Sequence, residues 1–242
     1  MNSNTPPKVV TLAAWVILLL ASLLPTVILQ EVLGQTVSSD QQALMSLGII
    51  VVALAVSLIW KPLRGLWPFL ILILVLTGSR WLVYNRIDEL GSYPRWLKHP
   101  SFNVYMLAEQ SLNLIVTLVM IAALFLLKKK RQDFYLAVGN LSAPAEPIGW
   151  MGVKQGDRWH KFGSWLTFFI SLGTLAFLII AGRPPLDIAI RALPYLPAVL
   201  LAAALNAFNE EVTYKASLLS VLESPVGPRQ ALYMVAVYFG IW

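Results

Sequence analysis

The sequence predicts an all-α, polytopic membrane helix bundle with about six spans and a partial seventh. Of the 242 residues, 58% are hydrophobic and 12% are charged, against about 25% charged residues in ordinary soluble domains. The apolar residues gather in runs long enough to cross a bilayer, which takes roughly 20 residues of helix. Cysteine is absent, which excludes a disulfide framework and a thiol nucleophile.

Six apolar runs are predicted to span the membrane. The first, Val9–Leu29, is longer than the roughly 7 to 15 apolar residues of a signal peptide, so we expect an uncleaved anchor. The others are Ala43–Trp60, Gly65–Tyr84, Val104–Leu127, Phe162–Ala181 and Ala189–Phe208. Pro25 lies in the first run, and Pro194 and Pro197 in the sixth. We expect local kinks there, because proline removes a backbone hydrogen bond.

A seventh apolar run, Ala231–Trp242, is about a dozen residues long, where a span needs roughly 20. We therefore expect a partial helix in a chain that is a fragment of a longer protein.

The distribution of Lys and Arg predicts the orientation of the chain. The connection 30–42 contains none, whereas the long connection 128–161 contains seven. Because short cytoplasmic loops collect positive charge, we expect a cytoplasmic N-terminus. The net charge of +6 then reflects topology and contact with anionic lipid, and the sequence shows no platform for nucleic acid.

An acidic pair, Glu210-Glu211, follows the sixth run. Carboxylates beside hydrocarbon are costly unless they are paired or functional. On a helix, Glu211 shares a face with Lys215 and can form a buried ion pair with it, whereas Glu210 lies on a polar stripe with Asn206 and Thr213. The other interpretation is that both acids are simply solvated where the helix meets water.

The residues around this pair resemble the CAAX protease and bacteriocin-processing (CPBP) family of intramembrane proteases. That family carries EExxxR on one membrane helix, FxxxH on the next, and a later HxxxN or HxxxD. Here the first motif reads Glu210-Glu211-Val-Thr-Tyr-Lys215, with Lys in place of Arg. Lysine cannot form the bidentate contact that arginine makes. The second motif reads Phe239-Gly-Ile-Trp242, so its histidine would be the next residue.

The resemblance implies an intramembrane endopeptidase that hydrolyses membrane-associated peptides with a Glu-activated water. It assigns catalytic roles to Glu210 and Glu211, with Lys215, Asn206 and Thr213 in support. The later histidines would complete the site beyond Trp242, either as ligands of a divalent metal such as zinc or as groups that activate water. The implied partners are the lipid bilayer and a membrane-associated peptide or protein, in a bacterial inner membrane.

The loop 132–161 contains prolines and glycines typical of a linker, and we expect it to be cytoplasmic. It divides an N-terminal four-helix membrane region (1–131) from the part that resembles the beginning of the protease core (162–242). With the predicted orientation, the sixth span places the acidic pair toward the cytoplasmic face.

Two other classes of function stay open. One is a non-catalytic membrane scaffold or bacteriocin-immunity protein of the same fold, and the other is a small-solute transporter. Among the remaining polar residues, Arg80 and Glu109 could pair across helices, although Arg80 fits better as a side chain reaching the headgroups. His99 and His160 lie in connections without a second ligand at metal-site spacing.

Overall fold

A computed structural model describes residues 8–86 and 101–241, and it confirms the all-α fold class. The described residues form helices, with a long connection between Leu126 and Trp159, and contain no strand, only two isolated antiparallel bridges. By their internal contacts they divide into one unit of residues 1–136 and 197–242 and a second unit of residues 137–196. The division at 131 and 161, predicted from the proline and glycine content of the loop between them, stays a prediction.

The first unit begins with a bent helix pair. Helix α1 (Lys8–Ala21) is followed by α2 (Leu24–Val27) and the π-helical turn η1 (Ile28–Val32), and the two parts meet at 55°. The Ser22 hydroxyl donates to the Leu19 carbonyl at 2.7 Å and accepts from the Leu24 N–H at 3.2 Å. Pro25 opens the second part, so the kink expected from this proline is present.

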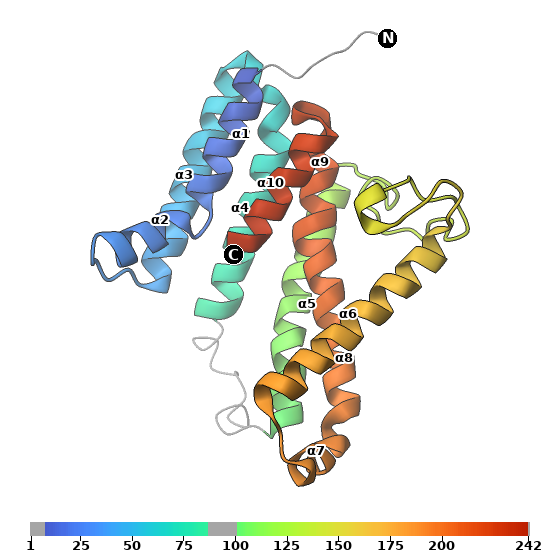
Figure 1. The fold of residues 1–242 in the computed structure, drawn as a ribbon. Helices are drawn as coiled ribbons and strands as arrows, with labels where there is room; N and C mark the ends of the chain where they lie inside the picture. The colour runs from blue at the N-terminus through green and yellow to red at the C-terminus, as the bar shows by residue number, and fades with distance from the viewer. Residues whose placement is uncertain (1–7, 87–100, 242) are drawn as a thin grey trace. The chain divides into compact units, whose positions relative to one another are not determined.

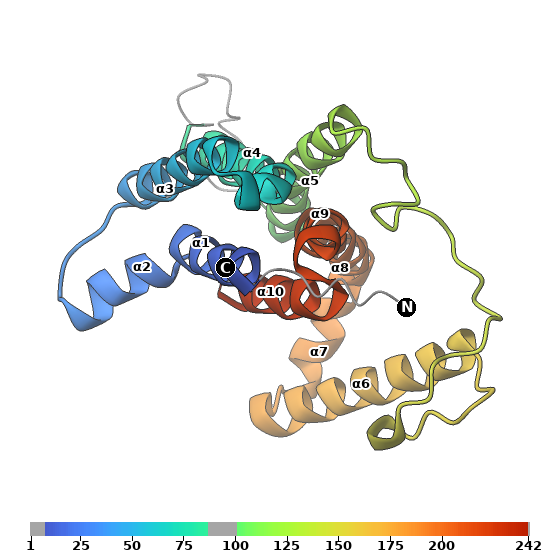
Figure 2. The same ribbon diagram turned by 90° about the horizontal axis from the view of Figure 1, so that it is seen from above.

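Three long helices follow. Helix α3 (Ser39–Ile59) starts at a capping box, in which Ser38 and Gln41 each bond the other's backbone N–H. The 3₁₀ turn η2 (Lys61–Leu66) leads into α4 (Trp67–Asn85), and α5 (Phe102–Leu126) is the third. Contacts join α3 to α4 and α4 to α5, and the three helices lie in this order in Figure 2.

The C-terminal part of this unit contains α8 (Leu196–Glu210), the π-helical turn η7 (Glu211–Ala216), α9 (Ser217–Val226) and α10 (Pro228–Ile241). The first three succeed one another without a loop. Gly227, with φ of 82°, ends α9 in a backbone conformation that L side chains rarely adopt. The predicted partial seventh helix is α10.

The core of this unit forms where α1, α4, α9 and α10 meet. Its fully buried side chains include Leu18, Phe69, Leu222 and Tyr238, and Figure 1 shows α10 lying between α1 and α9. The Trp15 indole N–H donates to Gln230 Oε1 at 3.0 Å, which ties the two ends of the chain together. The predicted stub is therefore an integral part of the bundle.

The segment after α5 is fastened to α9. Lys129 Nζ donates to the Ser220 carbonyl at 2.7 Å, and the Tyr135 hydroxyl donates to Glu223 Oε1 at 2.7 Å. The bond to Glu223 raises the pKa of Tyr135. The cytoplasmic end predicted for α5 thus lies level with residues 220–223.

The second unit holds α6 (Trp159–Gly182), α7 (Leu186–Ala192) and the 3₁₀ turn η6 (Leu193–Tyr195), preceded by a loop with the short 3₁₀ turn η5 (Gly149–Met151). None of the α6 side chains is buried by protein. A helix that is apolar and exposed all round suits a lipid environment.

Five helical segments of the described residues are long and apolar enough to cross a membrane, or up to six when the bent α1–α2 pair counts as one span. This agrees with the six predicted spans and is compatible with a multi-pass membrane protein. The sixth differs in extent, because the helical stretch runs over 41 residues from Leu186 to Val226. Asn209 to Lys215 continue the helix beyond the predicted apolar run, as the polar stripe of Asn206, Glu210 and Thr213 requires, and the end of the span at Phe208 stays a prediction.

Candidate functional site

Glu210 is the last residue of α8 and borders the π-helical turn η7, which contains the rest of the EExxxK motif. Its Oε1 accepts a hydrogen bond from Asn206 Nδ2 at 2.9 Å, as their i, i+4 spacing predicts. Inserted π turns are rare and occur frequently at functional sites.

The same acid lines a polar cavity of about 390 Å³ inside the first unit. Helices α4, α5 and α8 and the turn η7 form its wall, and all but one of the lining side chains are polar. They are Arg80, Tyr84, Glu109, Asn113, Val116, Asn206, Asn209, Glu210, Thr213 and Tyr214. Cavities of this size fall within the roughly 300–1,000 Å³ of small-molecule sites, so Glu210 has room beside it for water and a substrate group.

A buried cluster of three side chains fixes α8 and η7 against α5. Thr117 Oγ1 lies 2.9 Å from Asn209 Oδ1 and 2.9 Å from Thr213 Oγ1. Asn209 Nδ2 donates to the Gln110 carbonyl at 3.1 Å. All three side chains are buried, and buried polar groups of this kind are stabilising only while they remain bonded. The cluster sets the position of Glu210 on the adjoining turn.

Thr213 therefore differs from its expected role. The sequence pairs it with Asn206 as a residue that orients water, and the structure does bring both to the cavity. The Thr213 hydroxyl, however, is held by Thr117, so Thr213 mainly positions the helix, whereas Asn206 contacts the acid itself.

The acidic pair lies opposite the middle of α5. Around Glu210, the helix contacts Gln110 and Thr117, which lie near the middle of the 25-residue candidate span Phe102–Leu126. Residues 220–223 lie level with the end of that span. The placement of the pair toward the cytoplasmic face stays a prediction.

Arg80 supplies a positive charge to the cavity wall. Its guanidinium donates to the Tyr214 hydroxyl and lies 5.3 Å from the centre of the Tyr84 ring. Tyr84 in turn donates to Asn113 Oδ1 at 2.6 Å. Arg80 therefore faces the cavity, because two tyrosines provide it with partners inside the bundle. The sequence favours a different orientation, in which Arg80 reaches the lipid headgroups. Glu109 lines the same cavity.

The predicted Glu211–Lys215 ion pair is present, with Lys215 Nζ 2.9 Å from Glu211 Oε2. The pair is not buried by protein, since the Lys215 and Glu211 side chains are 42% and 62% exposed. Lys215 also lies 5.4 Å from the centre of the Phe239 ring, so the two motifs of the family resemblance meet here. Glu211 lies outside the lining of the cavity, and its catalytic role stays a prediction.

The described residues bring together no group of three His, Cys, Asp or Glu side chains that could hold a metal ion. His160 Nδ1 lies 3.1 Å from the Leu141 carbonyl in an exposed loop, and His99 lies outside the described residues. The described residues alone do not form a zinc centre, and a metal with histidine ligands beyond Trp242 stays a prediction.

Tyr84, Asn113, Thr117 and Tyr214 are site residues that the sequence reasoning missed. A signal for part of the set exists, because Glu109, Asn113 and Thr117 recur every four residues on an apolar helix and so share one face.

Comparisons with protein-family profiles, with curated proteins and with solved structures found no match for the chain.

Thr117→Val should lower the free energy of unfolding by about 1–3 kcal/mol, because it removes the hydrogen bonds that Thr117 makes to the buried side chains of Asn209 and Thr213. Thermal unfolding in one detergent measures this. Thr77→Val is the matched control, because the equally buried Thr77 hydroxyl has no hydrogen-bond partner among the described residues. Equal losses for the two variants would refute the role of the cluster.

Neutralising one member of the ion pair should cost more than neutralising both. Glu211→Gln leaves Lys215 without its carboxylate partner on a candidate membrane span, and a lone charge at the centre of a membrane helix costs about 2.5–3.5 kcal/mol. The double variant with Lys215→Met removes both charges and should regain most of the stability, and Lys215→Arg should be tolerated. The same unfolding assay tests this, and a neutral Glu211→Gln or Glu211→Ala would show that the pairing is wrong.

Proposed function

We propose that this chain carries part of the catalytic core of a CPBP-type intramembrane endopeptidase, in which Glu210 activates water for hydrolysis of a membrane-associated peptide. The single observation that carries the proposal is that Glu210 lines a polar cavity formed by apolar candidate spans, opposite the middle of α5. Ionisable residues inside a membrane-spanning bundle are costly and usually functional. The resemblance of the EExxxK run to the family motif supports the reaction type.

The chemistry follows from the groups around Glu210. Asn206 donates to Glu210 Oε1, which fixes the carboxylate and leaves Oε2 to accept a proton from water. The water oxygen then attacks the peptide carbonyl carbon and forms a tetrahedral intermediate. As the intermediate collapses, the C–N bond breaks and the protonated Glu210 returns the proton to the leaving amine, which leaves a carboxylic acid and a free amine. A general base contributes typically 10²–10⁴-fold to the rate. Arg80, held by Tyr214, provides a positive charge that suits an oxyanion or a substrate carboxylate.

The pairing of the charged side chains also favours a catalytic role for Glu210 over a purely structural one. The ion pair of Glu211 with Lys215 is satisfied within the motif, so the helix does not need Glu210 for that contact. Glu210 instead faces the cavity together with Arg80 and Glu109.

No step of this proposal uses a metal, because the described residues offer no such centre.

The cellular setting belongs to the same proposal. The long apolar helices are compatible with a multi-pass membrane protein, and we assign it to a bacterial inner membrane with a cytoplasmic N-terminus. This orientation rests on the seven Lys and Arg residues of 128–161. The substrate is a peptide or protein associated with that membrane.

Glu210→Gln should abolish cleavage, with a loss of about 10²–10⁴-fold, because it keeps the size and the bond to Asn206 but cannot accept the proton. The full protein is reconstituted in vesicles and assayed against a panel of membrane-anchored peptides. Glu31→Gln, at an exposed acid of the turn η1, is the control.

Unfolding temperatures of the variants are measured beside the activity. Full activity of Glu210→Gln would rule out Glu210 as the general base, and loss of folding would assign it a structural role. A folded wild-type protein that cleaves no peptide of the panel would favour the non-catalytic scaffold.

A further inference from the structure

A second cavity, of about 480 Å³, lies within the unit 137–196, where the loop before α6 covers the first turns of that helix. One wall is the loop and the other is one face of α6. The lining residues are Met151, Gly152, Val153 and Asp157 from the loop and Lys161, Phe162, Trp165, Leu166 and Phe169 from α6. Most of this lining is aromatic or aliphatic, and it contains one cation and one anion.

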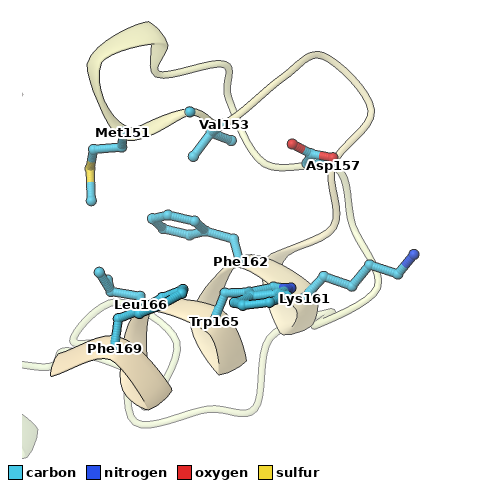
Figure 3. Close-up of a pocket in the computed structure, with 9 residues that line it drawn as sticks. Met151, Val153, Asp157, Lys161, Phe162, Trp165, Leu166 and Phe169 are labelled. Atoms are coloured by element: carbon cyan, nitrogen blue, oxygen red, sulfur yellow. The ribbon is translucent and has the colours of Figure 1, made fainter. Parts of the chain in front are cut away.

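The charged and apolar residues lie at different ends of the cavity. Figure 3 shows Asp157 and Lys161 toward one side, and Met151, Leu166 and Phe169 toward the other. Along α6, Phe169 follows Lys161 by eight residues, which is roughly 12 Å of helix. The cavity is therefore polar at one end and apolar at the other, as an amphiphilic ligand requires.

The direction of this gradient matches a bilayer. Helix α6, Trp159–Gly182, is a candidate span, so Lys161 in its first turn lies at the membrane surface and Phe169 lies nearer the hydrocarbon. Trp159 and Trp165 are the aromatic residues expected at such a boundary. The polar end of the cavity thus lies at headgroup depth.

The loop wall is held in place by hydrogen bonds. The Asp157 carboxylate accepts from the Lys154 N–H at 2.7 Å, and the Asp157 carbonyl accepts from the Ala145 N–H at 2.6 Å. A further bond joins Trp159 N–H to the Ala143 carbonyl at 3.2 Å. Within the described residues Asp157 and Lys161 form no ion pair, so both charges can serve a ligand.

We propose that this cavity binds one zwitterionic phospholipid with a primary ammonium headgroup, that is, a phosphatidylethanolamine. Its phosphate lies on Lys161, its ammonium on Asp157, and one acyl chain lies against Phe162, Trp165 and Phe169. The phosphate and the ammonium of the headgroup match the opposite charges of Lys161 and Asp157 at the polar end of the cavity. A purely anionic headgroup meets repulsion from Asp157, and a quaternary ammonium cannot donate hydrogen bonds to it. This proposal does not depend on the proposed function.

The test is native mass spectrometry of the delipidated full protein, titrated with phosphatidylethanolamine, phosphatidylcholine or phosphatidylglycerol of identical chains. We expect the first phosphatidylethanolamine to bind about tenfold more tightly than either other lipid, the effect of one charge-assisted hydrogen bond. Equal or tighter binding of phosphatidylglycerol would overturn the proposal and indicate general attraction to basic loops.

Matched variants locate the site. Lys161→Gln should weaken phosphatidylethanolamine about tenfold, whereas Lys161→Arg and the control Lys154→Gln, at an exposed lysine outside the lining, should not. Asp157→Asn should remove the preference for phosphatidylethanolamine over phosphatidylcholine. Circular dichroism checks that each variant is folded. A preference that persists unchanged in folded Asp157→Asn and Lys161→Gln variants would refute the site.

The apolar end is tested separately. Trp165→Ala should weaken all three lipids, whereas Phe177→Ala, an exposed aromatic further along α6, should leave them unchanged. Equal losses in these two variants would show that the lipids cover the helix without using the cavity.

Discussion

The hydrogen-bonded cluster of Thr117, Asn209 and Thr213 is the constraint on which the rest of the site depends. Its three side chains are buried between the helices, so its bonds fix how α8 and η7 are rotated and positioned along α5. Glu210 follows Asn209 directly, and its position is set by this contact. The same contact places the EExxxK motif opposite the middle of a candidate span.

The π-helical turn adds a second constraint at the same place. A π turn accommodates one more residue than an α turn, so it changes which side chains face the bundle beyond Glu210. The Ser217 hydroxyl donates to the Val212 and Thr213 carbonyls at the end of this turn. Ser217 satisfies carbonyls there and does not line the cavity. Glu210 and Tyr214 both face the cavity across the turn, while Glu211 and Lys215 face outward.

Much of the fold could be predicted from the sequence, because apolar runs of about 20 residues report spans directly. The bend at Pro25 and the Glu211–Lys215 pair follow from local rules and are present. The contact of the motif with the middle of α5 and the role of Arg80 could not be predicted, because both depend on which helices meet. The residues next to Arg80 in the sequence do not determine whether its side chain faces the headgroups or Tyr214. The packing of α4 against the C-terminal helices decides between these two orientations.

The central claim, that Glu210 faces a polar cavity that water can enter, is tested most directly by thiol labelling. The chain contains no cysteine, so single cysteines can be introduced without background and treated with a charged, water-soluble thiol reagent in intact vesicles. We predict that cysteine is modified at Asn206 and Asn113, which line the cavity. It should be protected at Leu118, an exposed position of α5 outside that lining. Protection of all three positions would contradict a water-filled cavity beside Glu210.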